Sequence, residues 1–307
     1  MIWPQKKSNV QKLEDTLFDG KDVQVFMLRD DLLHPGISGN KWRKLKYNLL
    51  DSAEKGIYKI VTVGGPYSNH IAAVAEAGKL FGFDTIGLIR GYESYRSNST
   101  LSRAEELGME IRFFSKSDYN DINQDYFNKL RKEEGEFVFV PMGGGNLLGM
   151  RGSKEIVSEI PKETTHITVA CGTGSTMAGI VAGTEENQKV IGFPAMKGGD
   201  FMVDEVNKFL RDAGVNMQNY NVETRYHFGG FAKMDVQLAD FLKAFYEKHG
   251  FVLDGIYNGK MMFGLYKMIT QDYFPKGSVI TAIHTGGVQG NRGLNERFGF
   301  NIPLASD

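Results

Sequence analysis

The chain has 307 residues, of which 41% are hydrophobic and 24% are charged, and its formal net charge is -1. These values describe an ordinary globular protein and argue against a nucleic-acid partner, because such proteins gather Lys and Arg into a basic surface. We expect a small neutral or zwitterionic ligand. The single cysteine, Cys171, excludes an internal disulfide. No segment reaches membrane-spanning length and the start lacks an apolar signal core, so we expect no membrane partner and a cytoplasmic location.

Short β-branched runs predict strands that alternate with helical patterns. In chain order, the predicted strands cover residues 23–28, 60–63, 85–89, 111–114, 137–140, 167–170 and 279–283. Alternation of this kind is typical of a mostly parallel α/β fold. Residues 50–150 are predicted to form a small inserted α/β domain, and residues 1–49 and 151–307 a larger one.

The first candidate site is a lysine run at the start of an amphipathic stretch. Trp42, Leu45 and Leu49 recur at helical spacing and predict a buried face. Lys41 and Lys44 lie three residues apart on another face and point the same way. A second cation nearby lowers the pKa of a lysine, which favours the neutral amine that forms a Schiff base with a carbonyl cofactor. A solvated basic helix surface is the alternative.

A glycine-bearing turn at residues 64–70 follows the strand at 60–63. Ser68 is placed there as the N-cap of the next helix. The free N–H groups of that helix start could also bind a substrate carboxylate, with Ser68, Asn69 and His70 at the same site. A simple capped helix and a substrate site both remain open.

A second turn follows the strand at 167–170 and consists of small residues. Its members are Gly172, Thr173, Gly174, Ser175 and Thr176. Backbone N–H groups and hydroxyls at a helix start are typical of a phosphate site. The turn lacks the third glycine of a dinucleotide fingerprint and the lysine of a nucleotide-triphosphate loop, so a single phosphate is expected. A tight turn that merely needs small residues is the alternative.

Two further segments near the C-terminal end carry candidate ligand contacts. Thr285 follows the strand at 279–283, and the carboxyl ends of parallel strands are where such folds bind ligands. Tyr257 could stack on a planar ring, although ordinary packing is the alternative. His284 is more readily explained as a satisfied core histidine than as a catalyst. The histidines show no paired spacing, so no metal site is expected.

Taken in this order, these segments resemble the pyridoxal-phosphate enzymes of the 1-aminocyclopropane-1-carboxylate deaminase and D-cysteine desulfhydrase family. The resemblance covers nearly the whole chain, from about Arg29 to Gly287. The motifs that carry it are Arg29–Leu32, Gly39–Leu45, Ser68–His70, Pro141–Asn146, Gly172–Thr176, Tyr257–Lys260 and His284–Gly287.

The resemblance implies a fold of the tryptophan-synthase-β type, with open mostly parallel sheets, helices on both faces, and pyridoxal 5'-phosphate between two domains. Lys41 would carry the cofactor as a Schiff base, and Lys44 with the turn at 172–176 would hold its phosphate. Asn69 would bond the ring hydroxyl. A homodimer is what the family suggests.

The resemblance also implies roles for residues around the cofactor ring and the substrate. Ser68 would lie beside the substrate and Tyr257 near the ring, and both would be catalytic together with Lys41. Asn258 and Thr285 would line the side of the pyridine nitrogen.

Three positions depart from the pattern of the family. Tyr67 replaces the usual glutamine before the Ser-Asn pair, which changes the pocket beside Ser68. Phe231 replaces a tyrosine, so a phenol acid/base is lost there. Gly145 replaces a serine and is the milder change.

These residues favour a lyase that converts D-cysteine to pyruvate, ammonia and sulfide. The family's deaminases have glutamate at the position of Asn258 and leucine at that of Thr285. A neutral asparagine is expected to donate its amide hydrogen to an unprotonated ring nitrogen, which makes the ring a weaker electron sink and suits a good β-leaving group. The alternatives are 1-aminocyclopropane-1-carboxylate deamination to 2-oxobutyrate and a non-catalytic pyridoxal-phosphate or small-ligand binding protein.

Overall fold

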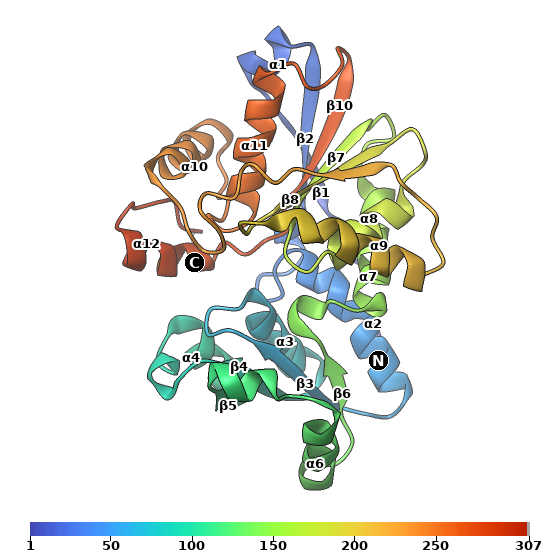
Figure 1. Cartoon of the computed structure of the whole chain (residues 1–307), viewed down its shortest axis with the longest axis vertical. Helices are drawn as coiled ribbons and strands as arrows, with labels where there is room; N and C mark the ends of the chain where they lie inside the picture. Colours follow the sequence, from blue (N-terminus) through green and yellow to red (C-terminus); the bar gives the residue numbers. More distant parts are fainter. Residues whose placement is uncertain (306–307) are drawn as a thin grey trace.

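The computed structural model describes residues 1–305, apart from the side chain of Asn120, and places two sheets at opposite ends of the long axis (Figure 1). Within these residues the larger sheet has six strands, β1 (Asn9–Leu13), β2 (Val23–Arg29), β10 (Ser278–Ile283), β7 (His166–Cys171), β8 (Lys189–Pro194) and β9 (Tyr220–Val222), in that spatial order. The smaller sheet has four, β5 (Glu110–Phe114), β4 (Asp84–Arg90), β3 (Lys59–Gly64) and β6 (Val138–Val140). β1 pairs antiparallel with β2, and the other neighbours are parallel.

Helices cover both faces of each sheet. The bounds are α1 (Thr16–Gly20), α2 (Asn40–Glu54), α3 (Asn69–Phe81), α4 (Ser99–Glu106), α5 (Lys116–Asn120), α6 (Gln124–Glu134), α7 (Leu147–Lys154), α8 (Ser175–Gly183), α9 (Met202–Asp212), α10 (Val236–His249), α11 (Asn258–Thr270) and α12 (Gly290–Phe298). One face of the larger sheet packs on α10 and α11, and the other on α7, α8 and α9. The smaller sheet lies between α2, α3 and α4 on one side and α6 on the other. This arrangement confirms the predicted fold class.

Each strand predicted from sequence is present, and three strands were missed. β1 and β9 are short and half-buried. In β8 the apolar run is interrupted by Gly192, which weakens the strand pattern. The glycine is needed because a Cβ there would lie 2.3 Å from Met177 Sδ of α8.

Helix α2 lies between the two sheets and carries the lysine run (Figure 1). It crosses the predicted boundary at residue 50, and α7 crosses that at residue 150. Trp3 and Trp42, assigned from sequence to the large domain, share a hydrophobic core with the smaller sheet. Helices and a core are thus shared across residues 50 and 150, and the domain boundaries at these two residues stay a prediction.

Candidate cofactor and substrate site

Asn40 joins three of the segments that were singled out from sequence. Its backbone N–H donates to Thr285 O at 3.2 Å, its Nδ2 donates to Thr176 Oγ1 at 2.9 Å, and its Oδ1 accepts from Lys41 Nζ at 2.7 Å. The preceding Gly39 has a φ of 63°, and a Cβ there would lie 1.9 Å from Thr285 O. The start of α2 is therefore pressed against the loop after β10 and the turn before α8. Asn40 belongs to the lysine motif, and its contacts with these segments give it a structural role that the motif alone does not indicate.

Lys41 and Lys44 are not on a solvated surface. Lys44 is 2% exposed, and burial lowers the pKa of Lys41 to about 8 while the Asp254 carboxylate opposes that shift. The expected cause was therefore wrong, because desolvation and not a second cation lowers the pKa of Lys41. The effect of the second cation falls on Lys44, whose pKa is lowered well below its usual range by burial and then by Lys41.

The surroundings of Lys44 fit a bound anion. Its Nζ donates a long hydrogen bond of 3.4 Å to Thr173 Oγ1 in the small-residue turn. Among the carboxylates of residues 1–305, none forms an ion pair with it. A buried ammonium without an anionic partner is costly, and the N–H groups at the start of α8 beside it also favour an anion. A phosphate group would satisfy both.

The turn at 172–176 is closely packed on its outer sides. Gly174 has a φ of 81° and is followed directly by α8. A Cβ on Gly172 would lie 3.4 Å from the Tyr257 ring, and one on Gly145 would lie 3.3 Å from Thr173. The turn thus meets both Tyr257 and the Gly143–Gly145 segment, so its glycines serve tight packing as well as an anion site.

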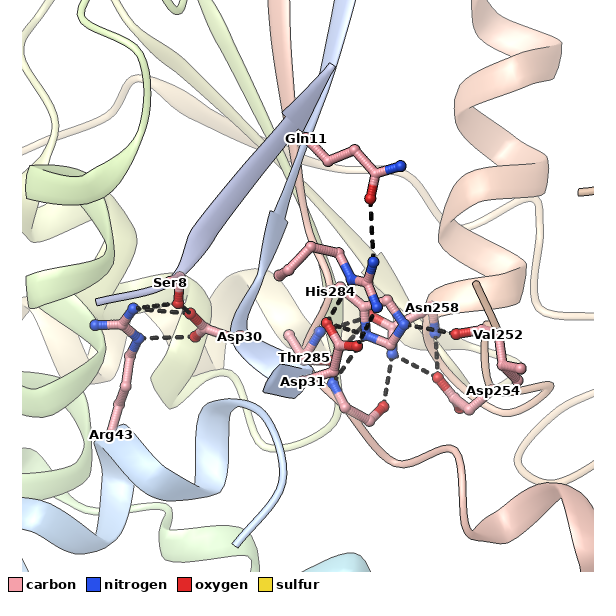
Figure 2. Close-up of polar contacts among 12 residues, drawn as sticks. Ser8, Gln11, Asp30, Asp31, Arg43, Val252, Asp254, Asn258, His284 and Thr285 are labelled. Carbon is pink, nitrogen blue, oxygen red and sulfur yellow. Dashed lines mark hydrogen bonds and ion pairs between the residues drawn. The ribbon is translucent and has the colours of Figure 1, made fainter. Parts of the chain in front are cut away.

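Asp254, Asn258 and Thr285 form one buried hydrogen-bonded group (Figure 2). Asn258 is 0% exposed, and its Nδ2 donates to Asp254 Oδ2 at 2.5 Å and to Gly286 O at 2.8 Å. Its Oδ1 accepts from the backbone N–H and the hydroxyl of Thr285, both at 3.0 Å. The expectation that the amide is free to donate to a ring nitrogen is wrong, because both of its hydrogens are already used. Thr285 is the less buried residue of this pair, at 9% exposed.

Asp254 is the charged residue that sequence reasoning missed at this site. Its carboxylate accepts from the backbone N–H groups of Ile256, Tyr257 and Asn258 at 3.0, 2.7 and 2.8 Å, in addition to the amide of Asn258. It raises the pKa of Lys41 against the effect of burial. The only local signal was its position in the turn before Tyr257.

His284 is a satisfied core histidine, as expected. Its Nε2 donates to Val252 O at 2.8 Å, and its Nδ1 accepts from the backbone N–H of Gly286 at 3.2 Å (Figure 2). Both ring nitrogens are therefore used within the core, and this histidine has no free group for catalysis.

Ser68 caps α3, as predicted from sequence. Its Oγ accepts from the N–H groups of His70 and Ile71 at 3.2 and 3.3 Å, which leaves its hydroxyl hydrogen for another acceptor. Asn69 lies against the loop after β10: its Oδ1 accepts from Gln289 at 2.6 Å, and a Cβ on Gly287 would lie 2.6 Å from its Nδ2. Among the described contacts none joins Ser68 directly to Lys41.

His70 is buried between the smaller sheet and the two lysines. Thr62 donates its hydroxyl to Val140 O, so the ring Nε2 of His70, 2.9 Å away, donates to Thr62 Oγ1. Its Nδ1 is buried and has no hydrogen-bond partner among the described residues. Burial, Lys41 and Lys44 hold the pKa of His70 well below its usual range, so the ring is neutral. It therefore contributes no positive charge for a substrate carboxylate.

Tyr257, Phe231 and Tyr67 lie around the same region. Burial and the Asp254 charge raise the pKa of the Tyr257 phenol, so it stays protonated. Phe231 is 54% exposed and meets the Tyr257 ring edge-on at 5.9 Å between centroids. The Tyr67 ring lies 3.6 Å from a Cβ position on Gly293 of α12, so it bridges the smaller-sheet side and the C-terminal helix.

A cavity of about 330 Å³ lies beside α3 and α4, and neither of the two lysines nor Ser68 is among the residues that line it. Ser38, Glu76, Arg103 and Gln289 are among its lining residues, and Gln289 is the partner of Asn69. The cavity thus lies between segments of the smaller sheet and the loop after β10.

Residues 1–305 contain neither a candidate membrane span nor a candidate metal site. None of the helices there has the length and apolar character that crossing a membrane requires. Nor do histidine, cysteine and carboxylate side chains of this part of the chain gather in groups of three that could hold a metal ion.

Comparison with known proteins gives concordant matches. The model of the pyridoxal-phosphate dependent enzyme family matches residues 13–286. A bifunctional D-cysteine desulfhydrase/1-aminocyclopropane-1-carboxylate deaminase of Arabidopsis thaliana, a mitochondrial protein, is 30% identical over 87% of this chain and 73% of its own. A D-cysteine desulfhydrase of Klebsiella pneumoniae is 25% identical over 88% and 89%. The crystal structure of an ACC deaminase homologue superposes with a TM-score of 0.85 at 26% identity, covering 96% of this chain and 95% of that chain.

Proposed function

Because the chain belongs to the pyridoxal-phosphate-dependent enzyme family, in the group of 1-aminocyclopropane-1-carboxylate deaminases and D-cysteine desulfhydrases, we propose that it eliminates sulfide from D-cysteine. The products would be pyruvate, ammonia and sulfide. Enzymes of this family use pyridoxal 5'-phosphate, which supplies a conjugated ring that accepts the electron pair left when a proton departs from the substrate's α-carbon.

The two lysines of α2 suit the two ends of that cofactor. Lys41, with a pKa of about 8, has a substantial neutral fraction near neutral pH, which suits it to bind a carbonyl carbon and then to take a proton from the substrate. Lys44 and the turn at 172–176 offer a buried cation and a helix start to the phosphate. Asn69 would meet the ring hydroxyl, and Tyr257 would pack beside the ring.

The substrate's carboxylate is best placed at the start of α3. The helix N-terminus offers backbone N–H groups and a favourable dipole, and Ser68 has a hydroxyl hydrogen left to donate. His70 is neutral, so its contribution there is the backbone N–H and not charge.

The observation that carries the choice of D-cysteine is the neutral group at Asn258 and Thr285. The Asp254 carboxylate already accepts from four N–H donors, two of them on Asn258. The hydroxyl of Thr285 donates its hydrogen to Asn258 Oδ1, so its oxygen lone pairs are what it can offer to a ring N–H. A hydroxyl next to the ring nitrogen holds a proton there far less strongly than a carboxylate would. The ring is then a modest electron sink, which suits departure of a thiolate more than ring opening.

Phe231 supports the same choice. It lies edge-on to Tyr257, at the place where the resemblance expects a second phenol. A phenyl ring cannot exchange a proton with the substrate, so opening a cyclopropane ring would lack an acid/base partner. Deamination of 1-aminocyclopropane-1-carboxylate is therefore the weaker alternative, and the non-catalytic alternative is set aside by the family assignment.

The test is a direct comparison of substrates with the purified holoenzyme. Sulfide release is followed with D-cysteine and L-cysteine, and 2-oxobutyrate formation with 1-aminocyclopropane-1-carboxylate. We expect sulfide from D-cysteine, little from L-cysteine and no useful deamination. Faster formation of 2-oxobutyrate than of sulfide would show that the argument from Asn258 and Thr285 is wrong.

A further inference from the structure

Lys260 of α11 is a buried lysine, like Lys44 of α2, but it has no role in the site described above. Its side chain is 2% exposed, and its Nζ donates to three backbone carbonyl oxygens, those of Ala195 at 3.2 Å, His227 at 2.9 Å and Gly230 at 2.7 Å. An ammonium group has three N–H donors, so all of them are used. Burial lowers its pKa to about 8, against the opposing charge of Asp254. Lysine is seldom this buried, so the arrangement calls for a reason.

The loop that Lys260 contacts, residues 227–232, has a strained backbone. Phe228 and Ala232 have φ values of 52° and 50°, and Gly229 and Gly230 have values of 85° and 126°. Side chains of L-residues rarely adopt positive φ, and such a conformation persists only where the surroundings enforce it. Two of the three carbonyl oxygens that Lys260 binds belong to this loop.

Three side chains at successive three-residue intervals of α11 hold the loop. Tyr257 meets Phe231 at 5.9 Å, Lys260 binds the two carbonyl oxygens, and Phe263 meets Phe228 at 4.9 Å between ring centroids. Residues three apart lie on one face of a helix, so these contacts form a continuous line along α11. Lys260 is at the middle of that line.

We propose that Lys260 is a positioning residue that clamps the loop 227–232 onto α11 and so holds Phe231 against Tyr257 as one wall of the substrate pocket. Phe231 is 54% exposed, and the Tyr257 ring on which it rests packs against Gly172 of the candidate phosphate turn. The wall therefore faces the same space as the cofactor residues. The choice of D-cysteine as probe rests on the proposed function.

The clamp is tested with Lys260→Met, which keeps an unbranched side chain one atom shorter and removes all three donors. Lys208→Met on the exposed side of α9 is the matched control. Amide hydrogen exchange of residues 227–232 in the holoenzyme should become about tenfold faster in Lys260→Met and stay unchanged in the control. Equal exchange in Lys260→Met and the wild type would overturn the clamp.

The positioning role is tested by separating KM from cofactor affinity. We expect KM for D-cysteine to rise about tenfold in Lys260→Met, with the Kd for pyridoxal phosphate nearly unchanged. A general structural defect would instead weaken cofactor binding and speed exchange throughout α11, which would overturn the proposal. Lys260→Arg keeps N–H donors, so its KM should lie between those of the wild type and Lys260→Met.

A second variant keeps the proposal testable if Lys260→Met does not fold. Phe231→Ala removes the wall and leaves the clamp, so KM should rise while exchange of 227–232 keeps its wild-type rate; an unchanged KM would overturn the proposal. If the wild type releases no sulfide from D-cysteine, the proposed function fails. The hydrogen-exchange experiment still decides whether Lys260 clamps the loop. The effect on the pocket is then measured as the Kd of an amino acid that alters the cofactor's visible spectrum, which replaces the KM.

Discussion

At the scale of single residues, Lys41 is expected to react in a pH range unusual for lysine. With a pKa of about 8, roughly a tenth of its amine is neutral at pH 7, against about three parts in ten thousand for a free lysine. The neutral fraction reaches one half near pH 8 and levels off above about pH 9. The rate at which the apoprotein binds pyridoxal phosphate covalently, trapped with borohydride, should follow that curve, and Lys41→Ala should abolish it. A label mapped to a different lysine, or a rate that keeps climbing to pH 10, would contradict the assignment.

Lys44 should show opposite effects on stability and on cofactor binding. Lys44→Met removes a buried amine whose charged form lacks an anionic partner, so the apoprotein should be harder to unfold with urea. The same change should weaken pyridoxal-phosphate binding about tenfold or more, because a charge-assisted hydrogen bond contributes roughly 1.5 to 3 kcal/mol.

Lys46→Met is the control on the same helix. Lys46 pairs with Glu155 at 2.7 Å, so its loss should cost at most about 1 kcal/mol and leave cofactor binding unchanged. Equal effects of the two substitutions on cofactor binding would remove Lys44 from the phosphate site.

Ser68 caps α3 through its hydroxyl, and we also propose that this hydroxyl takes part in catalysis. Removing the hydroxyl therefore allows the loss of turnover to be compared with the loss of stability. Ser68→Ala removes the cap of α3, which typically costs about 1 kcal/mol. Turnover of D-cysteine should fall much further than this loss of stability explains. Ser68→Thr, which keeps a capping hydroxyl, should retain the stability. Wild-type turnover in the alanine variant would leave Ser68 as a cap only.

At the scale of elements, the placement of α2 depends on a close helix crossing. A Cβ on Gly152 of α7 would lie 1.9 Å from the backbone oxygen of Arg43 in α2. Gly152→Ala should therefore push α2 away, lower stability by about 1 to 3 kcal/mol and weaken cofactor binding, because Lys41 and Lys44 move with the helix.

Gly20→Ala provides the matched control for this crossing. Gly20 ends α1 with no atom within 4 Å of a Cβ position, so the substitution should be neutral or slightly stabilising. Thermal unfolding and cofactor titration of both variants decide the point. A Gly152→Ala protein with wild-type cofactor affinity would show that the crossing does not set the site.

At the scale of the whole molecule, Arg43 connects segments far apart in the sequence. It is 3% exposed, pairs with Asp30 at 2.7 Å and donates to Ser8 (Figure 2). It also pairs with Glu159 at 3.0 Å. Arg43→Met would leave two buried or partly buried carboxylates without their cation. We expect a loss of about 3 to 5 kcal/mol in urea unfolding.

Arg29→Met offers the comparison for that loss. Arg29 forms an ion pair with Asp31 at 2.7 Å, donates to Gln11 and lies over the Phe251 ring. Its substitution leaves one carboxylate without its cation instead of two, and the pair is more exposed, so a smaller loss is expected. A cost for Arg43→Met below that of Arg29→Met would show that the buried group does not hold these segments together.

Much of the fold could be predicted because its determinants are local. β-branched runs such as 60–63 and 279–283 mark strands, Ser68 marks a helix start, and the small-residue turn at 172–176 marks the start of α8. These patterns depend on backbone conformation and on neighbours a few residues away. The order of the motifs along the chain also predicted that the cofactor is pyridoxal 5'-phosphate.

The properties of the site depended on contacts between distant residues, which only the tertiary structure decided. Asn258 uses both amide hydrogens on Asp254 and Gly286, the pKa of Lys41 is lowered by burial, and Lys260 reaches carbonyl oxygens 30, 33 and 65 residues away. Hydrogen-bond partners and desolvation depend on how separate segments pack, and the residue type at a single position does not predict that packing. Residue types and their order therefore determined which chemistry is present, and packing decided which of their atoms are free to perform it.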